Sequence, residues 1–141
     1  MSKMEVTLAL LADYANVTRE GKLNLLGLFE RINAPTLPWT HPQMQLVLVF
    51  EASPAEYDTT KNAEIKLLDA DGNTKFTISS ELKVPREKSG RSVSINGIIA
   101  INNLRFDTEG DYAFHILIGG DDKKRIPLRV SYAPRSQPGP G

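Results

Sequence analysis

Apolar and polar residues alternate with a period of two through most of the chain. Near its start, Val6, Leu8, Leu10 and Ala12 occupy alternate positions. No window keeps the roughly 3.6-residue spacing that an amphipathic helix requires. Strict alternation is typical of a strand with one buried face. The pattern therefore predicts a chain built from β-strands.

Gly, Asn, Asp and Pro residues divide the chain into segments that are each expected to form a strand. Gly21 lies in a turn that joins the first two segments into a hairpin, and Asp69–Asn73 marks a second hairpin turn. Residues 34–42 contain three prolines, which remove backbone donors, so we expect a crossing loop there. The expected strands cover residues 6–12, 23–32, 43–52, 63–68, 76–84, 93–101, 112–118 and 126–132.

Strands at this spacing predict an all-β fold, namely an antiparallel Greek-key β-sandwich of about eight strands. Tyr112 follows a turn at the start of a late strand, as in the tyrosine corner of sandwiches that are immunoglobulin-like in the broad sense. An ordinary core tyrosine and a closed barrel remain alternatives. We expect one domain over residues 1–133 and a disordered Pro/Gly tail over residues 134–141.

Charge and cysteine content narrow the classes of protein. Lys and Arg total 17, Asp and Glu total 17, and there is no cysteine. A balanced charge argues against a nucleic-acid partner, and the missing thiols exclude disulfides and zinc-thiolate sites. The apolar run Val6–Ala12 is too short for a membrane span and resembles no signal peptide. We therefore expect a cytoplasmic protein with no nucleic-acid partner.

Residues suited to catalysis are sparse. His41 lies in the proline-rich segment and His115 alternates out of phase with its apolar neighbours, so the two do not form a ligand set. No phosphate-binding loop, nucleophile elbow or metalloprotease motif is present. We expect no catalytic residue, no cofactor and no enzyme activity.

The acidic turn offers a weak metal site. Asp69, Asp71 and Asn73 carry oxygen ligands of the kind that calcium prefers. A calcium loop would need a glutamate at position 80, where the chain has Ser80. The hairpin turn is the favoured interpretation. Calcium and lipid binding in the manner of C2-type sandwiches, through acidic loops at 107–111 and 121–122, stays an alternative.

Several strands are apolar on both faces. The residues expected opposite the main core rows are Ala9 and Leu11, Leu26 and Leu28, Val47 and Val49, and Ile98 and Ala100. A sandwich strand needs only one buried face, so another element must cover the second. The loops at 34–42 and 53–62, or another protein chain, would cover the second apolar face. The candidate interface residues are Leu11, Tyr14, Leu26, Leu28, Trp39, Val47 and Val49.

Three short motifs carry a resemblance to a known family. They are Leu11–Ala15 (L-A-D-Y-A), Gly21–Asn24 (G-K-L-N) with Gly27–Phe29 (G-L-F), and Gly110–Phe114 (G-x-Y-x-F). In these the chain resembles an uncharacterised family of bacterial proteins over roughly residues 5–132. The resemblance implies a bacterial source and a β-sandwich, and it brings no activity.

The sequence thus favours a non-enzymatic protein-interaction or assembly module that uses an apolar sheet face or edge from its first three strands. Its partner would be a second copy of the chain, giving a homo-oligomer, or the product of a neighbouring gene. The alternative is a ligand-binding sandwich for carbohydrate or for calcium and lipid, with Trp39, Tyr57 and Tyr14 as aromatic candidates.

Overall fold

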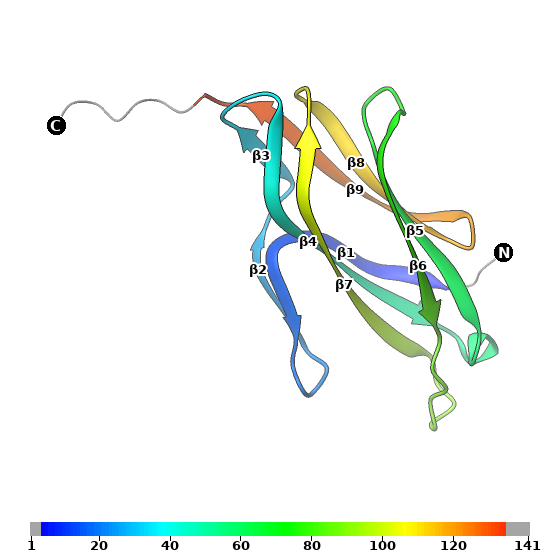
Figure 1. Cartoon of the computed structure of the whole chain (residues 1–141). Coiled ribbons are helices and arrows are strands. Elements are labelled where there is room, and N and C mark those ends of the chain that lie inside the picture. Colours follow the sequence, from blue (N-terminus) through cyan, green and yellow to red (C-terminus); the bar gives the residue numbers. More distant parts are fainter. Residues whose placement is uncertain (1–3, 135–141) are drawn as a thin grey trace.

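Nine β-strands make up the computed structural model, which describes residues 4–134 (Figure 1). The helical part of this range is one short 3₁₀ turn, η1 (Pro54–Glu56). The strands are β1 (Glu5–Val17), β2 (Leu23–Leu28), β3 (Arg31–Ala34), β4 (Trp39–Ala52), β5 (Thr60–Leu68), β6 (Thr74–Lys83), β7 (Val93–Phe106), β8 (Gly110–Ile118) and β9 (Asp121–Tyr132). No helix in residues 4–134 has the length and apolar character needed to cross a membrane.

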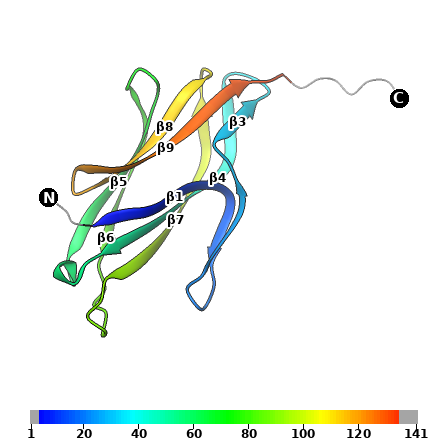
Figure 2. The same ribbon diagram turned by 180° about the vertical axis from the view of Figure 1, so that it is seen from behind.

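The strands form two sheets that pack face to face (Figure 2). One sheet has the order β2-β1-β4-β7 and the other β3-β9-β8-β5-β6. Three hairpins, β1–β2, β5–β6 and β8–β9, stay within a sheet, and the other connections cross between sheets. The predicted all-β sandwich is confirmed. The strand count is nine, because a short strand, β3, pairs in parallel with β9.

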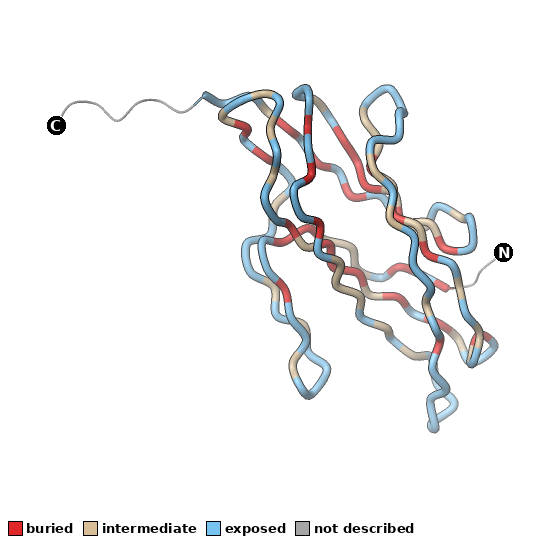
Figure 3. The backbone as a smooth tube through the Cα atoms, viewed as in Figure 1, coloured by how far each residue is buried: buried red, intermediate tan, exposed pale blue. Residues whose placement is uncertain are grey.

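Apolar side chains of both inner faces fill the space between the sheets. The largest fully buried ones include Phe50, Phe106 and Phe114. Exposure alternates residue by residue along β9 from Arg125 to Val130, as expected when one sheet face is in water, but β4 has a run of buried residues from Leu46 to Leu48. Figure 3 shows this difference as alternating and continuous colours along the strands. The four-stranded sheet is therefore apolar on both faces.

The predicted strand over residues 23–32 is wrong as a single element. The chain forms β2, leaves the four-stranded sheet after Leu28, and joins the other sheet as β3. Gly27 has a φ of +68°, a left-handed conformation that interrupts a regular strand. The backbone N–H of Phe29 then makes a last bond to the carbonyl of Leu11, at 3.1 Å, before the crossing.

The predicted loop over residues 34–42 is also shorter in the structure, because β4 begins at Trp39. Proline is tolerated at position 42 since β4 pairs with β1 only from Gln45 onward. Residues 39–44 therefore have β7 on one side and no strand on the other, which is the edge position that accepts proline.

The faces assigned to the first strand change at a β-bulge between Val6 and Leu8. A bulge inserts one residue and reverses the alternation that follows it. Ala9 and Leu11 consequently point into the core, and Leu8 and Leu10 point outward. The prediction that Ala9 and Leu11 lie opposite the core row is wrong for this reason.

Tyr112 forms the bond expected of a tyrosine corner. Its hydroxyl donates to the backbone carbonyl of Thr108 at 2.7 Å, and its ring packs edge-on against Phe106 at 5.1 Å. The tyrosine thereby ties the β7–β8 turn to the core. The expected Pro/Gly tail falls on residues 134–141, of which 135–141 lie outside the described range.

Tyr112→Phe should lower the free energy of unfolding by about 1 kcal/mol, because the Thr108 carbonyl loses its donor while the ring stays packed. Urea unfolding measures this, with Tyr132→Phe at a half-exposed tyrosine as the matched control. Equal stability of the two variants would contradict the role given to the Tyr112 hydroxyl.

Candidate interaction surface

Large apolar side chains that remain in water are concentrated on the β1–β2 hairpin. Five such residues are exposed in the described range, and the hairpin carries all of them except Tyr132. Leu26 is 64% exposed, Leu28 56% and Tyr14 46%. An exposed apolar cluster of this kind marks interaction sites more often than scattered single residues do.

Three of these side chains share one face of the hairpin. Tyr14 lies opposite Leu26 in the strand register, and Leu28 lies opposite Ala12, two positions further along. Directly opposed and diagonal neighbours in antiparallel strands are close enough for their side chains to touch. We call Tyr14, Leu26 and Leu28 the hairpin patch.

The hairpin leans across the outer face of the four-stranded sheet. Its turn reaches β7, where the side-chain amide of Asn96 donates to the carbonyl of Gly21 at 3.4 Å. Nearer its base, the backbone N–H of Ala15 donates to the Gln45 side chain at 2.6 Å. β1 also contacts β7, although β4 separates them in the sheet. The hairpin therefore covers part of the second apolar face of this sheet.

That outer face has little charge. Its central row is Leu10, Val47 and Ile98, which lie side by side on β1, β4 and β7. Val47 has no exposed surface, although it is not part of the core between the sheets. The outer face of the other sheet carries many more charged groups. Its ionisable residues include Glu64, Lys66, Asp111, His115, Arg125 and Arg129.

The candidate interface residues fall into three groups in the structure. Tyr14, Leu26 and Leu28 lie together on the hairpin, and Val47 and Val49 lie on the outer sheet face. Leu11 is 1% exposed and belongs to the core.

Trp39 lies apart from the hairpin and outer-face residues, since it packs against the core cluster. The two loops expected to cover the sheet also pack against the core cluster, through Leu37 and Tyr57. The cover supplied by the chain is the hairpin, which the sequence pattern did not indicate.

β2 is also the edge of its sheet. No strand pairs with its outer side in the described structure, and residues 23–29 contain no charged residue or proline. Natural sheets usually protect an edge with charge, proline or short length. β3, at an edge of the other sheet, is short, and β6 carries Lys75, Glu81 and Lys83. Leu28 further lines a groove of about 510 Å³ that runs between β1 and β9.

A small aromatic pocket lies where the chain crosses between the sheets. It measures about 200 Å³ and is lined by Asp13, Phe29, Arg31, Ile32, Asn33, Trp39 and His41. The ring of His41 lies 6.0 Å from that of Phe29, and its Nδ1 accepts a hydrogen bond from the Trp39 indole at 3.4 Å. Burial lowers the pKa of His41, and the nearby Asp13 carboxylate opposes this effect. Sequence reasoning missed this pocket because its residues come from three separate segments, at position 13, positions 29–33 and positions 39–41.

Gly27 makes room for one wall of the pocket. A Cβ atom at Gly27 would lie 2.9 Å from the carboxyl carbon of Asp13 and nearer still to one of its oxygens. The bare backbone therefore lets the Asp13 side chain lie across β2.

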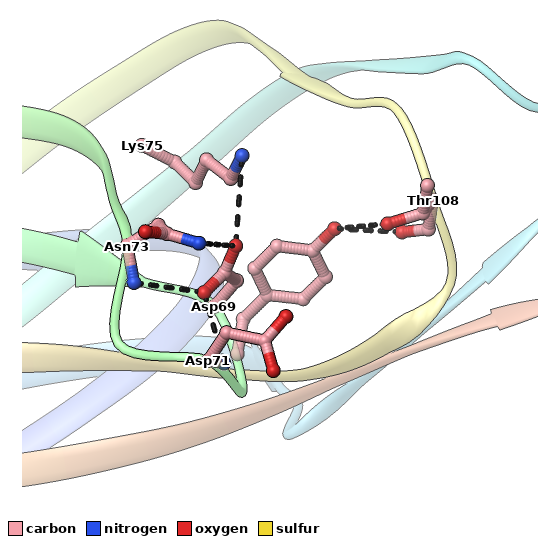
Figure 4. A network of polar contacts seen from close by, with 6 residues as sticks. Asp69, Asp71, Asn73, Lys75 and Thr108 are labelled. Carbon is pink, nitrogen blue, oxygen red and sulfur yellow. Dashed lines mark hydrogen bonds and ion pairs between the residues drawn. The ribbon is translucent and has the colours of Figure 1, made fainter.

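The acidic turn is a hairpin turn (Figure 4). One carboxylate oxygen of Asp69 accepts the backbone N–H groups of Asp71 and Asn73, at 3.0 and 2.9 Å. The bond from the Asn73 backbone is the main cause of a lowered pKa at Asp69, with Lys75 contributing. Asp69 is thus occupied in bracing the turn, and residues 4–134 contain no group of three or more His, Asp or Glu residues arranged to hold a metal.

Three arginines line one groove of the protein, although the sequence contains no run of basic residues that would have predicted this. Arg31 of β3 lines a groove of about 530 Å³ together with Arg125 and Arg129 of β9. Asp111 lines the same groove and pairs with Arg129 at 2.9 Å. The groove therefore mixes both charge signs.

Comparison with known proteins gives a family and a fold. A family model described as a family of unknown function (DUF6941) matches residues 7–131. No curated protein matches the chain.

Among solved structures, a Pseudomonas fluorescens alkylpurine DNA glycosylase, AlkC, bound to DNA containing an abasic site analogue, is similar at a TM-score of 0.53 and 11% identity. The similarity covers 92% of this chain and 31% of the glycosylase chain. This chain thus spans less than a third of that protein, and the likeness shows the fold alone.

The expectation of no nucleic-acid partner needs correction. The fold found here recurs in part of a DNA-bound protein, and three arginines line one groove of this chain. Net charge failed as an argument because it averages over the whole surface, whereas phosphate contacts depend on local clusters.

Gly27→Ala should destabilise the fold by about 2 kcal/mol, since alanine is strained at a left-handed φ and its Cβ meets Asp13. In an Asp13→Ala background the same substitution should cost less, because the carboxyl group is gone. Thermal or urea unfolding of the four proteins measures the coupling. Strictly additive effects would contradict the contact between Asp13 and position 27.

Acid should weaken the fold through His41. Its pKa is lower in the folded protein than the ordinary value of 6.5, so the folded state favours the neutral ring. The stability gained from this is present above pH 6.5 and is lost as pH falls below it. His41→Gln should flatten this part of the pH profile of unfolding, and an unchanged slope would contradict the assignment.

Proposed function

The chain belongs to this family of unknown function (DUF6941), and because the match brings no activity we propose a function from the geometry. The protein is a non-enzymatic interaction module that binds another protein through its β1–β2 hairpin. Its contact surface combines the hairpin patch with the uncharged edge of β2.

The observation that carries this proposal is the exposure of the hairpin patch. Tyr14, Leu26 and Leu28 are each between 46% and 64% exposed and lie on one face. Each large apolar side chain taken out of water contributes about 1.5–3 kcal/mol at full burial. Half of that for three neighbouring side chains is enough to anchor a contact, and tyrosine is a favoured residue at such centres.

The charge distribution around the patch supports a protein surface as the partner. Residues 23–29 are uncharged, and the adjoining outer sheet face is apolar at its centre. Interface cores are depleted in charged residues relative to the rest of a protein surface. The charged outer face of the five-stranded sheet is typical of a surface that stays in water.

We further propose a class for the sandwich and a cellular location for the protein. We class the sandwich as immunoglobulin-like in the broad sense, on the support of the Tyr112–Thr108 corner. We also place the protein in the cytoplasm of a bacterium. The motif resemblance supports a bacterial source, and the lack of cysteine supports a reducing compartment, where disulfides are rare.

A second candidate function is the binding of a small ligand, such as a sugar ring, in the aromatic pocket. The specific observation is the grouping of Phe29, Trp39 and His41 around about 200 Å³, with Asp13 and Asn33 offering polar atoms. Aromatic walls with a few convergent polar groups are typical of ligand sites. The pocket is small for a drug-sized ligand, so we rank this function below the first.

Photo-crosslinking in living cells tests the leading proposal. A photoreactive amino acid at Leu26 or Leu28 should give adducts of higher mass, because these side chains would contact the partner. Thr77 and Ser79, exposed on β6 of the other sheet, are the matched control positions and should give few adducts. Mass spectrometry then identifies the partner.

Adducts that form equally at the hairpin and at β6, or at neither place, would contradict the proposal of a protein partner.

Titration of the purified protein with a panel of monosaccharides tests the second candidate function. Tryptophan fluorescence is the readout, since Trp39 is the single tryptophan.

A further inference from the structure

Two charged residues line the aromatic pocket, and they carry opposite signs. Asp13 and Arg31 both contribute to its wall, yet no ion pair joins them in the described structure. The Asp13 carboxylate makes no hydrogen bond or ion pair with any residue of the range 4–134. Arg31 also lines the larger groove, beside Arg125 and Arg129. The pocket therefore holds a carboxylate that no cationic group of the described chain neutralises by direct contact.

The backbone of β2 fixes the place of this carboxylate. A Cβ atom at Gly27 would lie 3.1 Å from the Cβ of Asp13 and nearer to its carboxyl group, so the side chain lies directly against the glycine. Asp13 precedes Tyr14, and successive residues of a strand point to opposite faces. The carboxylate is therefore directed away from the hairpin patch and lines the pocket.

The aromatic walls of the pocket are uncharged and are not stacked flat on one another. The ring planes of Phe29 and His41 are inclined at 42°, and those of Trp39 and His41 at 65°. The indole N–H of Trp39 donates to Nδ1 of His41, so this nitrogen carries no proton and the imidazole is neutral. Burial lowers the pKa of His41 and favours the same neutral ring. Inclined rings leave ring surface free for a ligand.

We propose that this pocket binds an organic cation, namely an alkylated ammonium group. The face of an aromatic ring attracts a cation that lies within about 6 Å of the ring centre, and tryptophan does so most strongly. Asp13 adds a full negative charge to the same wall. This inference rests on the second candidate function, because it assigns a charge to the ligand of that pocket.

The size of the pocket and its internal hydrogen bond favour this ligand over a sugar ring. A volume of about 200 Å³ suits one head group or the end of one side chain. A sugar has hydroxyl groups that need partners, but the Trp39 N–H and the His41 Nδ1 are already bonded to each other. An alkylated ammonium needs ring surface and a carboxylate, which the pocket supplies.

Titration of the purified protein with choline tests the inference, with the fluorescence of Trp39, the single tryptophan, as the readout. The matched ligand is the neutral alcohol of the same shape, in which carbon replaces the charged nitrogen of choline. Choline should bind about tenfold more tightly than this alcohol, since attraction to the rings and to the carboxylate both require the charge. Sodium chloride at equal ionic strength should leave the fluorescence unchanged.

Variants at the two charged residues should act in opposite directions. Asp13→Asn should weaken choline binding about fivefold, because an attraction is lost, and Arg31→Gln should tighten it about twofold, because a repulsion is lost. Glu81→Gln, on β6 of the other sheet, removes the same charge as Asp13→Asn and should change nothing. Circular dichroism checks that each variant folds. An anionic ligand would reverse both signs.

Titration with a lysine blocked at both ends distinguishes two sources of the cation. Binding of this lysine, with the same loss in Asp13→Asn, would support a side chain of a partner protein as the source. Binding of choline alone would support a free small molecule.

Equal binding of choline and the neutral alcohol, binding that Asp13→Asn leaves unchanged, or no binding of either cation would overturn the cation as the ligand. Binding of a monosaccharide would then still uphold the second candidate function, and its absence would remove both. Crosslinking at Leu26 and Leu28 tests the protein partner of the hairpin independently of these results.

Discussion

The crossing of the chain from one sheet to the other at Gly27–Glu30 determines the features that point to function. Because Gly27 has a left-handed φ and no side chain, the Asp13 side chain lies across β2 and the chain turns away after Leu28. β2 therefore ends early and remains at the edge of its sheet. The same crossing brings Phe29 beside Trp39 and His41 and so creates the aromatic pocket.

The two sheets differ in what they present to water. In the five-stranded sheet, exposure alternates along β9 from Arg125 to Val130 and the outer face carries charged residues, so that sheet needs no further cover. The four-stranded sheet is apolar on both faces, and the β1–β2 hairpin folds over part of the second face, with Gly21 reaching Asn96. Covering Val47 in this way leaves the opposite side of the hairpin, with Tyr14 and Leu26, facing outward. The hairpin thus shields the apolar outer face of the sheet but exposes apolar side chains of its own. This exposed apolar surface is the physical reason for assigning the hairpin a partner.

Local patterns predicted the strands and the turns at Gly21 and Asp69–Asn73, because alternation and turn chemistry are properties of adjacent residues. The faces of β1 were predicted wrongly, since the bulge after Val6 arises from pairing with a distant strand. The start of β4 at Trp39 depends on the absence of a neighbour on one side of Pro42, which no local pattern records. Gly27 within an apolar run was a usable sign of the break in the predicted second strand. No feature of the sequence indicated that the hairpin would lie across the sheet toward Asn96.

Radical labelling of side chains, carried out in cells and on dilute purified protein, shows whether a partner covers the hairpin patch. Tyr132 is 50% exposed and far from the hairpin in sequence, so it serves as the internal reference for Tyr14 at 46%. We expect Tyr14, Leu26 and Leu28 to be protected in cells while Tyr132 is labelled equally in both samples. Equal labelling of the hairpin residues in both samples would show that the patch stays in water, and would contradict the assignment of this hairpin as a protein-binding surface.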